Sequence, residues 1–248
     1  MRFVKMEGLG NDFVVVDGPF APTADQVASW CDRHRGIGAD GVLVVTAGDP
    51  ISMEYWNADG SPAEMCGNGL RCVARYARMR GDADRDEFDV ATPVGIRSVG
   101  VSADSVRVSL GRVSVAATTE TAAGVELRRV EVGNPHAVVL VNDVESTAVE
   151  DLGPVISSDA RFPSGVNVGF AAVTDRNRLR LRVWERGVGE TLACGTGAAA
   201  AAAAASAAGL TDSVVTVTLS GGDLSVEISS DGAWIDGPAR VVYEGTIG

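Results

Sequence analysis

Two cysteines occupy the same kind of local sequence at distant points of the chain. The stretch "AEMCGNGLRC" places Cys66 directly before Gly-Asn-Gly, and "ETLACGTGA" places Cys194 directly before Gly-Thr-Gly and a run of alanines. Helix-favouring residues follow each glycine-rich segment, so both thiols are predicted at helix N-termini. Backbone N–H groups and positive dipole charge at such an end lower the pKa of a thiol and can bind a carboxylate.

This pairing of thiols and anion-binding helix ends predicts proton transfer at a carbon next to a carboxylate. If the two sites face one ligand from opposite sides, one thiolate removes a proton and the other thiol returns one, which inverts the carbon centre. The helix ends would stabilise the enolate-like intermediate. The alternative for a free cysteine is a small buried hydrophobic residue. We adopt that alternative for Cys31 and Cys72, which lie inside predicted helices.

The two cysteine motifs belong to a longer internal repeat. Trp56 precedes Cys66, and Trp184 precedes Cys194, by the same number of residues without a gap, and "GNDFVVVD" in the first half pairs with "GNPHAVVL" in the second. The order is the same in both halves: a Gly-Asn strand, a strand ending in Trp, a glycine turn, and Cys-Gly-x-Gly before a helix. This order predicts an α+β fold of two similar domains related by duplication, each a curled, barrel-like sheet around a central helix.

The elements of this fold follow from local pattern. Helices are predicted over 23–34, 69–80 and 197–208, each ending near a glycine. The alanine tract fits a helix enclosed by strands, because small side chains let the strands approach; a flexible linker is the alternative. The domains are expected at 1–112, completed by a C-terminal strand at 241–248, and at 113–240. Strands are predicted over 12–18, 41–48, 52–60, 105–110, 136–143, 178–187, 213–219, 224–229 and 241–245.

Composition excludes several classes of protein. The chain has 248 residues, of which 46% are hydrophobic, and its net charge is −12. The sequence contains no Lys/Arg-rich patch of the kind that would indicate nucleic-acid binding. No apolar run indicates a membrane span or a signal peptide, so a cytoplasmic protein with free thiols is expected. Two histidines and no C-x-x-C leave little material for a zinc site.

At these residues the chain resembles the diaminopimelate epimerase family. "NADGSPAEMCGNGLRC" and "ERGVGETLACGTGA" are similar to the two signatures of that family, and "KMEGLGNDFVVVD", "RHRGIGADGVL", "GNPHAV", "GVNVGF" and "GPARVVYEGTI" also have counterparts. The resemblance implies a cofactor-independent isomerase that interconverts LL- and meso-diaminopimelate, in lysine and peptidoglycan precursor synthesis. It also implies a homodimer and no bound metal.

The resemblance further implies a role for individual residues. Cys66 and Cys194 would be the two bases, His136 and Glu185 would tune the pKa of the cysteines, and Tyr243 would lie at the subunit contact. The expected substrate contacts are Asn11, Asn57, Gly67, Asn68, Asn134, Asn167, Glu185, Arg186, Gly195 and Thr196. Several have a simpler alternative: Asn11, Asn134 and Asn57 could be turn residues, Glu185 and Arg186 a solvated pair, and His136 a structural histidine.

Other functions remain open at this point. "GIGADG" (36–41) matches a dinucleotide-binding pattern but follows a predicted helix and precedes a predicted strand, the reverse of what that pattern requires. A thiol hydrolase would leave one cysteine motif without a role. A racemase of another amino acid, or a non-catalytic amino-acid-binding module, is also possible. Gly41, where some family members carry Gln, and Glu7, where many carry His, are departures that bear on substrate choice. Pro62 is a third, in a predicted turn.

Overall fold

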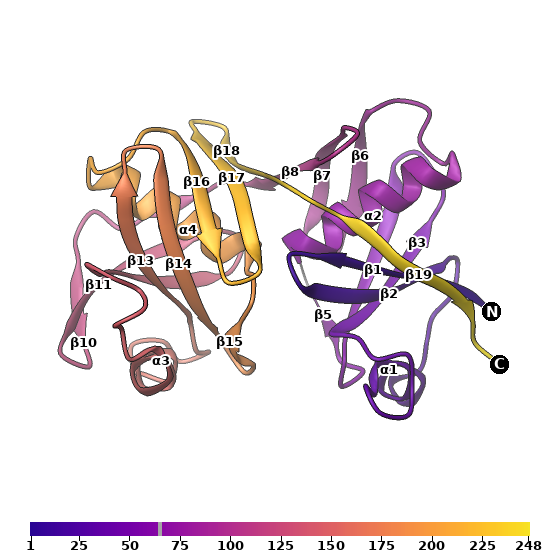
Figure 1. The fold of residues 1–248 in the computed structure, drawn as a ribbon, viewed down its shortest axis with the longest axis horizontal. Coiled ribbons are helices and arrows are strands. Elements are labelled where there is room, and N and C mark those ends of the chain that lie inside the picture. Colours follow the sequence, from indigo (N-terminus) through magenta and orange to yellow (C-terminus); the bar gives the residue numbers. More distant parts are fainter. Residues whose placement is uncertain (64–65) are drawn as a thin grey trace. The chain divides into compact units, whose positions relative to one another are not determined.

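The computed structural model describes residues 1–63 and 66–248, and the chain divides into two compact units (Figure 1). Unit 1 comprises Met1–Val108 together with Gly237–Gly248, and unit 2 comprises Ser109–Asp236. The C-terminal segment therefore leaves unit 2 and completes unit 1. In the residues that the structure describes, each unit combines a mixed sheet with two helices, which confirms the α+β fold class.

Unit 1 is a sheet whose strands run in the order β19, β1, β2, β3, β4, β6, β7 and β8. Neighbours are antiparallel except for the β2/β3 and β4/β6 pairs, which are parallel, and the short β5 pairs with β4. The strands are β1 (Arg2–Gly8), β2 (Asn11–Asp17), β3 (Gly41–Thr46), β4 (Ile51–Asn57), β5 (Pro62–Ala63), β6 (Glu87–Thr92), β7 (Gly95–Val101), β8 (Val106–Gly111) and β19 (Arg240–Thr246); the helices are α1 (Ala24–Cys31) and α2 (Gly67–Arg80).

Unit 2 repeats this connectivity. Its order is β11, β12, β13, β14, β16, β17 and β18, with parallel β12/β13 and β14/β16 pairs, β15 on β14, and β9 and β10 on β11. The elements are β9 (Ser114–Val115), β10 (Glu120–Ala122), β11 (Val125–Glu131), β12 (Pro135–Leu140), α3 (Val149–Ser157), β13 (Asn167–Asp175), β14 (Arg178–Glu185), β15 (Gly189–Thr191), α4 (Gly195–Ala207), β16 (Val214–Leu219), β17 (Gly222–Ser229) and β18 (Gly232–Gly237). The predicted duplication is confirmed.

The strand register makes individual positions in the two units equivalent. Phe13 of β2 lies opposite Gly41 of β3, and His136 of β12 lies opposite Asn167 of β13. Asn11 and Asn134, each two residues earlier, therefore occupy corresponding places at the start of corresponding strands. The sequence match between the two Gly-Asn segments reflects a match in structure.

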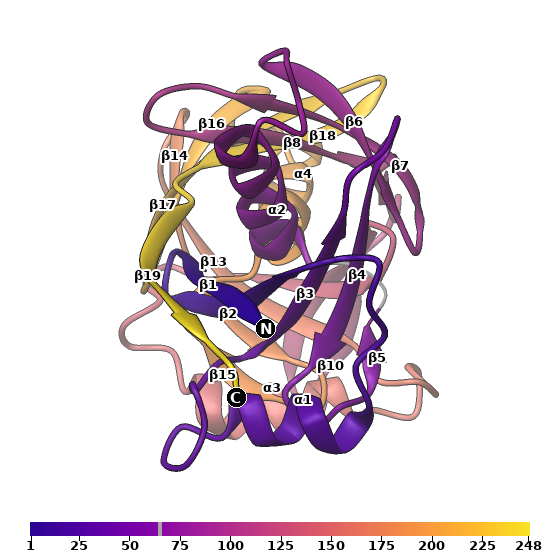
Figure 2. The same cartoon turned by 90° about the vertical axis from the view of Figure 1, so that its right-hand side faces the viewer.

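A central helix is enclosed by the curled sheet of each unit. Helix α2 contacts β1, β2, β3, β4 and β7, and Figure 2 shows it surrounded by the strands of unit 1. Helix α4 contacts β11, β12, β13, β14, β16 and β17. Every alanine from Ala198 to Ala205 is at most 2% exposed, so α4 is buried all round its axis. A helix in that position has room only for small side chains, which explains the alanine run.

Helix α1 begins as predicted but ends earlier. Thr23 caps it, with its side chain accepting the Gln26 N–H while the Gln26 side chain accepts the Thr23 N–H. The helix ends at Cys31 rather than at His34. The Asp32 carboxylate accepts hydrogen bonds from the N–H groups of His34 and Arg35, and this turns the chain out of the helix. Cys31 and Cys72 are buried, as expected, and burial raises the pKa of both thiols.

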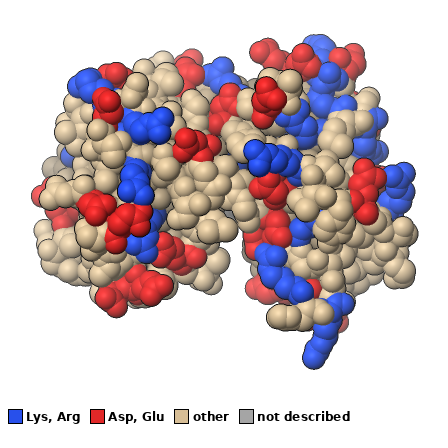
Figure 3. Space-filling model, in the orientation of Figure 1, with Lys and Arg blue, Asp and Glu red and all other residues tan. Residues whose placement is uncertain are grey.

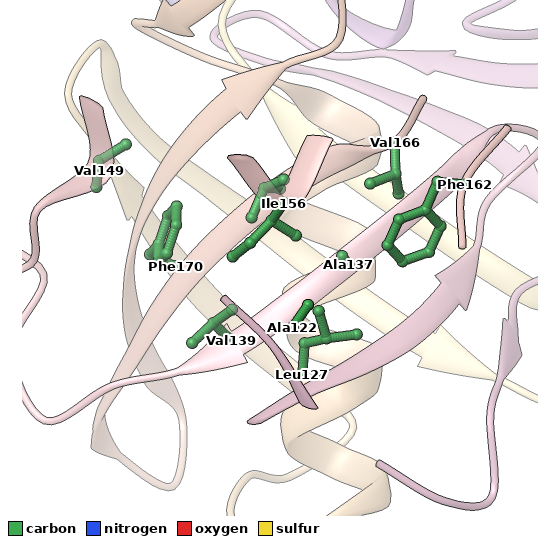
Figure 4. Close-up of a cluster of buried hydrophobic side chains, with 10 residues drawn as sticks. Ala122, Leu127, Ala137, Val139, Val149, Ile156, Phe162, Val166 and Phe170 are labelled. Atoms are coloured by element: carbon green, nitrogen blue, oxygen red, sulfur yellow. The ribbon is translucent and has the colours of Figure 1, made fainter. Parts of the chain in front are cut away.

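Helix α3 was not predicted from the sequence, because Gly153 and Pro154 interrupt its helical pattern. A Cβ atom at Gly153 would lie 2.6 Å from Cγ of Trp184, so glycine permits the close approach of α3 to β14. The helix packs through Val149 and Ile156 on a buried cluster that includes Phe170 of β13 (Figure 4). Tertiary packing here outweighs weak local propensity.

The surface carries mixed charge. On the face drawn in Figure 3, acidic and basic side chains are interspersed on each unit. Within residues 1–63 and 66–248, no helix is long and apolar enough to cross a membrane.

The enclosure of α4 predicts that an enlarged side chain will disrupt it. Replacing Ala201, which is fully buried, by leucine should lower the free energy of unfolding by about 1–3 kcal/mol, because the added atoms overpack the space between helix and sheet. Urea unfolding followed by circular dichroism measures this change. Ala207→Leu is the matched control on the exposed last turn of the same helix and should change stability by less than about 0.5 kcal/mol. Equal effects at both positions would contradict the enclosure.

Candidate active site

Cys66 is the N-cap residue of the central helix of unit 1. Its backbone is extended, with φ −139° and ψ 114°, and its sulfur accepts the Gly69 N–H at 3.3 Å. Its thiol donates to Oδ1 of Asn11 at 3.5 Å, and Nδ2 of Asn68 donates to the same oxygen at 3.2 Å. Cys66, Asn11 and Asn68, which we call the Cys66 half-site, thus join the start of β2 to the first turn of α2.

Asn11 is hydrogen-bonded to a network of four charged residues, Asp40, Arg33, Asp12 and Lys5. Nδ2 of Asn11 donates to Oδ2 of Asp40 at 2.6 Å, and the Arg33 guanidinium bonds both Asp40 and Asp12 at 2.7 Å. Lys5, only 4% exposed, pairs with Asp12 at 2.7 Å. Burial acts to raise the pKa of Asp12, but the hydrogen bonds from Arg33 and Lys5 outweigh it and lower the pKa to about 2.

Sequence reasoning missed these four charged residues. Arg33 and Asp40 lie in "RHRGIGADGVL", and Lys5 and Asp12 lie in "KMEGLGNDFVVVD", so the signal was their position within family-like segments. Opposite charges on non-adjacent elements are not paired by sequence alone.

Cys194 is the N-cap residue of α4 and holds the equivalent place in unit 2. Its backbone, at φ −130° and ψ 109°, resembles that of Cys66. Its sulfur lies 3.5 Å from Oγ1 of Thr196, which accepts from Nδ2 of Asn134 at 3.4 Å. Cys194, Thr196 and Asn134 form the Cys194 half-site. A Cβ atom at Gly197 would lie 3.3 Å from the sulfur, so a larger residue there would press on the thiol.

The expected lowering of the Cys194 pKa is wrong. The sulfur is buried, and burial raises the pKa of its thiol well above the ordinary value; the nearby Glu185 carboxylate raises it further. The Thr196 hydroxyl and the Gly197 N–H act in the opposite direction but do not outweigh burial. Glu185 in turn accepts a hydrogen bond from Thr191 at 2.6 Å, which fixes its carboxylate. Cys194 is therefore a thiol near neutral pH.

His136 is neutral in the folded protein. It is 1% exposed, and burial, together with the positive charge of Arg186, lowers its pKa to about 3. Its Nε2 donates to Oδ1 of Asn134 at 2.9 Å, and its Nδ1 has no hydrogen-bond partner among residues 1–63 and 66–248. The imidazole therefore orients the Asn134 amide.

Asn167 and Arg186 lie together in unit 2. Oδ1 of Asn167 accepts the Arg186 N–H at 3.0 Å, and Nδ2 of Asn167 donates to the Pro135 carbonyl at 3.3 Å. The Arg186 guanidinium bonds the Ser164 carbonyl at 2.9 Å. These contacts place a side-chain amide beside the strand that carries His136.

Asn57 and Tyr243 make contacts within unit 1. Nδ2 of Asn57 donates to Oγ of Ser61 at 3.0 Å in the turn after β4. The Tyr243 hydroxyl donates to the Ile37 carbonyl at 3.2 Å, and its ring meets Phe3 edge-on at 5.9 Å. Asn57 thus has a turn contact, and Tyr243 holds the loop before β3.

Gly41 occupies the position in unit 1 that corresponds to Asn167 in unit 2. A Cβ atom at Gly41 would overlap the Trp56 carbonyl and lie 2.6 Å from the Tyr55 ring. Unit 1 therefore lacks the side-chain amide that unit 2 has at this place. Gly67 and Gly195 are the first residues of their helices, so their N–H groups belong to the unpaired first turn.

In chemical terms, each half-site offers a thiol, a side-chain amide and helix N–H groups. This set can move a proton at sulfur and bind a carboxylate or oxyanion. Across the part of the chain that the structure describes, no cluster of three or more His, Cys, Asp or Glu side chains could hold a metal ion.

The neutral state of His136 predicts a loss of stability in acid. Between pH 6.5 and about 3 the unfolded chain binds a proton at this residue that the folded protein does not, so the free energy of unfolding falls as the pH falls. From pH 6.5 to about 5 this loss is about 2 kcal/mol. His136→Gln should lose less than the wild type over this range in urea titrations. His34→Gln, at the exposed second histidine, should behave as the wild type; equal slopes in all three proteins would contradict the assignment.

The raised pKa of Cys194 predicts the effect of neutralising Glu185. Glu185→Gln removes a negative charge near the sulfur, so the pKa of Cys194 should fall and its alkylation by iodoacetamide at fixed pH should speed up about threefold or more. Peptide mass spectrometry separates Cys194 from the other cysteines. Glu145→Gln, at an exposed residue paired with Arg180, should leave the rate unchanged. A slower reaction in Glu185→Gln would refute the electrostatic cause.

The chain is similar to known proteins along its length. The family model described as "Diaminopimelate epimerase" matches residues 3–116 and 128–245. A diaminopimelate epimerase of Alkalilimnicola ehrlichii is 42% identical over 274 residues, covering 100% of this chain and 98% of its own.

Solved structures with low sequence identity share the fold. A phenazine biosynthesis protein of the PhzF family from Bacillus anthracis has a TM-score of 0.79 at 14% identity, covering 100% of this chain and 98% of its own. A hydroxyproline epimerase from Agrobacterium vitis has a TM-score of 0.76 at 15% identity, covering 100% and 90%. The full-length match to the family model, together with 42% identity to a full-length relative, shows that the chain belongs to the diaminopimelate epimerase family.

Proposed function

We propose that this protein is an isomerase that interconverts LL- and meso-diaminopimelate, with Cys66 and Cys194 as its two acid–base groups. Family membership supports the reaction. The observation that carries the site assignment is that each cysteine is the N-cap of the enclosed helix of its unit. Both thiols thus have the same relation to helix N–H groups and to a side-chain amide.

Epimerisation requires removal of the α-hydrogen as a proton and its replacement from the opposite side. In the proposed reaction one cysteine, as thiolate, takes the α-proton, and the electron pair moves into the carboxylate to form an enolate-like intermediate. The other cysteine, as thiol, then gives a proton to the same carbon from the other side. The first-turn N–H groups of α2 and α4, which include those of Gly67, Asn68, Gly195 and Thr196, would stabilise the developing negative charge.

The surroundings of the two cysteines differ. Because burial and Glu185 raise the pKa of Cys194, this residue suits the role of proton donor. Cys66, which is partly exposed, would then be the base that removes the α-proton, and we assign this role to the reaction that starts from the LL isomer. The reverse reaction exchanges the two roles.

The remaining polar residues suit a substrate with two amino and two carboxylate groups. Asn11, Asn134 and Asn167 supply neutral amides, and Arg186 supplies a positive charge for a carboxylate. The substrate would replace some of their present contacts, such as that between Arg186 and the Ser164 carbonyl.

The protein is also proposed to work without a cofactor, as a homodimer in the cytoplasm. The resemblance of "GPARVVYEGTI" to a segment of the family's subunit contact supports the dimer. Val241, Val242 and Tyr243 in this segment are 38%, 55% and 44% exposed, which leaves apolar surface for such a contact. The two thiol half-sites supply both proton-transfer groups that the reaction needs.

Single cysteine variants test the mechanism. Cys66→Ser and Cys194→Ser should each lose net epimerisation in both directions by about three orders of magnitude or more, because serine hardly ionises near neutral pH. Incubation with LL- or meso-diaminopimelate in D₂O, followed by NMR, measures α-proton exchange and epimerisation together. Each variant should retain exchange with one isomer, and the two should differ in which isomer they accept.

Cys31→Ala is the matched control, since it removes a buried thiol of unit 1 outside the half-sites and should keep the wild-type rate. Near wild-type epimerisation in either serine variant would refute the two-base mechanism. Lack of exchange by the wild type would refute the substrate.

A further inference from the structure

The Asp40 carboxylate fixes which end of the Asn11 amide faces Cys66. Oδ2 of Asp40 accepts from Nδ2 of Asn11 at 2.6 Å and from the Asp12 N–H at 3.1 Å, while its Oδ1 accepts from Arg33 at 2.7 Å. An ionised carboxylate can only accept hydrogen bonds. Asn11 must therefore turn its NH₂ group to Asp40 and its oxygen to Cys66 and Asn68.

The loop that carries Asp40 is held from several sides. Lys5 of β1 donates to the Gly38 carbonyl, and Tyr243 of β19 donates to the Ile37 carbonyl at 3.2 Å. The Arg33 guanidinium donates hydrogen bonds to both carboxylate oxygens of Asp12, at 3.0 and 2.7 Å. These contacts tie the loop to β1, β2 and β19, so Asp40 has a defined place beside Asn11.

The equivalent amide in unit 2 is fixed in the opposite sense. Oδ1 of Asn134 accepts from Nε2 of His136, so Asn134 turns its NH₂ group toward Thr196 and the Cys194 half-site. The neutral imidazole of His136 orients the asparagine amide in unit 2, as the carboxylate of Asp40 does in unit 1. The imidazole donates a hydrogen bond and the carboxylate accepts one, so the two amides are turned in opposite directions. The two half-sites present opposite ends of the same side chain.

We propose that Asp40, held by Arg33, is a positioning residue of the Cys66 half-site that keeps the oxygen of Asn11 beside the thiol. A carbonyl oxygen at 3.5 Å accepts from the S–H group and favours the thiol, whereas an N–H group in its place would favour the thiolate. The consequence for catalysis rests on the proposed function. The effect on the reactivity of Cys66 does not, because it needs no substrate.

Asp40→Asn tests the proposal with a nearly isosteric change. Three donors now converge on the two oxygens of Asp40. Asparagine offers only one oxygen beside its NH₂ group, so its side chain cannot present an acceptor both to Arg33 and to Asn11. Asn11 is then free to turn its NH₂ group to the sulfur. Alkylation of Cys66 by iodoacetamide near neutral pH should become about fivefold faster, with Cys194 unchanged as an internal control. In the epimerase assay kcat should fall about tenfold or more, further than KM rises.

Asp17→Asn is the matched control. Asp17 lies at the other end of β2, pairs with Arg80 and accepts from the Tyr76 hydroxyl, so its neutralisation also removes an ion pair of unit 1 but leaves Asn11 untouched. It should leave the alkylation rate of Cys66 and the kcat as in the wild type. Arg33→Gln, at a side chain that is 54% exposed, loosens Asp40 without altering it and should speed up alkylation of Cys66 to a smaller extent.

The outcomes separate this proposal from the proposed function. Faster alkylation of Cys66 in Asp40→Asn and Arg33→Gln, but not in Asp17→Asn, would support it even if the wild type did not act on diaminopimelate. Unchanged or slower alkylation of Cys66 in folded Asp40→Asn would overturn it, as would an equal change at Cys194. Melting curves establish that the variants are folded, and if Asp40→Asn does not fold, the rate in Arg33→Gln decides.

Discussion

The enclosure of a helix by a curled sheet is the constraint on which the rest of this structure depends. A helix surrounded by strands can carry only small residues where the strands come close, which α4 meets with its run of buried alanines. Enclosure also buries the sides of the helix and leaves its first turn as the place where unpaired N–H groups are available. A functional group that needs these N–H groups must lie at the N-cap, and each unit has a cysteine there.

Duplication supplied two copies of this arrangement, and the surrounding residues made them different. In unit 1 the Asn11 amide is hydrogen-bonded to a network of four charged residues, and in unit 2 the Asn134 amide is hydrogen-bonded to a buried neutral histidine. The cysteines differ too, since Cys194 is buried next to Glu185 whereas Cys66 is partly exposed. A reaction that takes a proton with one group and gives a proton with the other benefits from such a difference.

Much of this arrangement was predictable from the sequence, and the failures have physical causes. The repeat of Trp, glycine turn and Cys-Gly-x-Gly predicted two equivalent units and the N-cap positions of both thiols, because these features depend on local sequence. Helix α3 was missed because its stability comes from the packing of its Val149 and Ile156 on a cluster with Phe170 and Trp184 rather than from propensity. The pKa of Cys194 was misjudged because a helix end was weighed without burial, which only the tertiary structure reveals. The pairing of Asp40 with Asn11 joins segments that sequence alone does not bring together.

The return of the C-terminal strand to unit 1 has a consequence for synthesis on the ribosome. Strand β19 pairs with β1 from Arg240 to Thr246, with one shift of register between Lys5 and Met6, and the Met1 amino group donates to the Ile247 carbonyl at 2.7 Å. While unit 2 is being made, the N-terminal half has an unpaired edge at β1, and Tyr243 is not yet present to hold the loop that carries Asp40. Unit 1 therefore gains its β19 strand, and the Tyr243 contact to this loop, only after the residues of unit 2 have been translated.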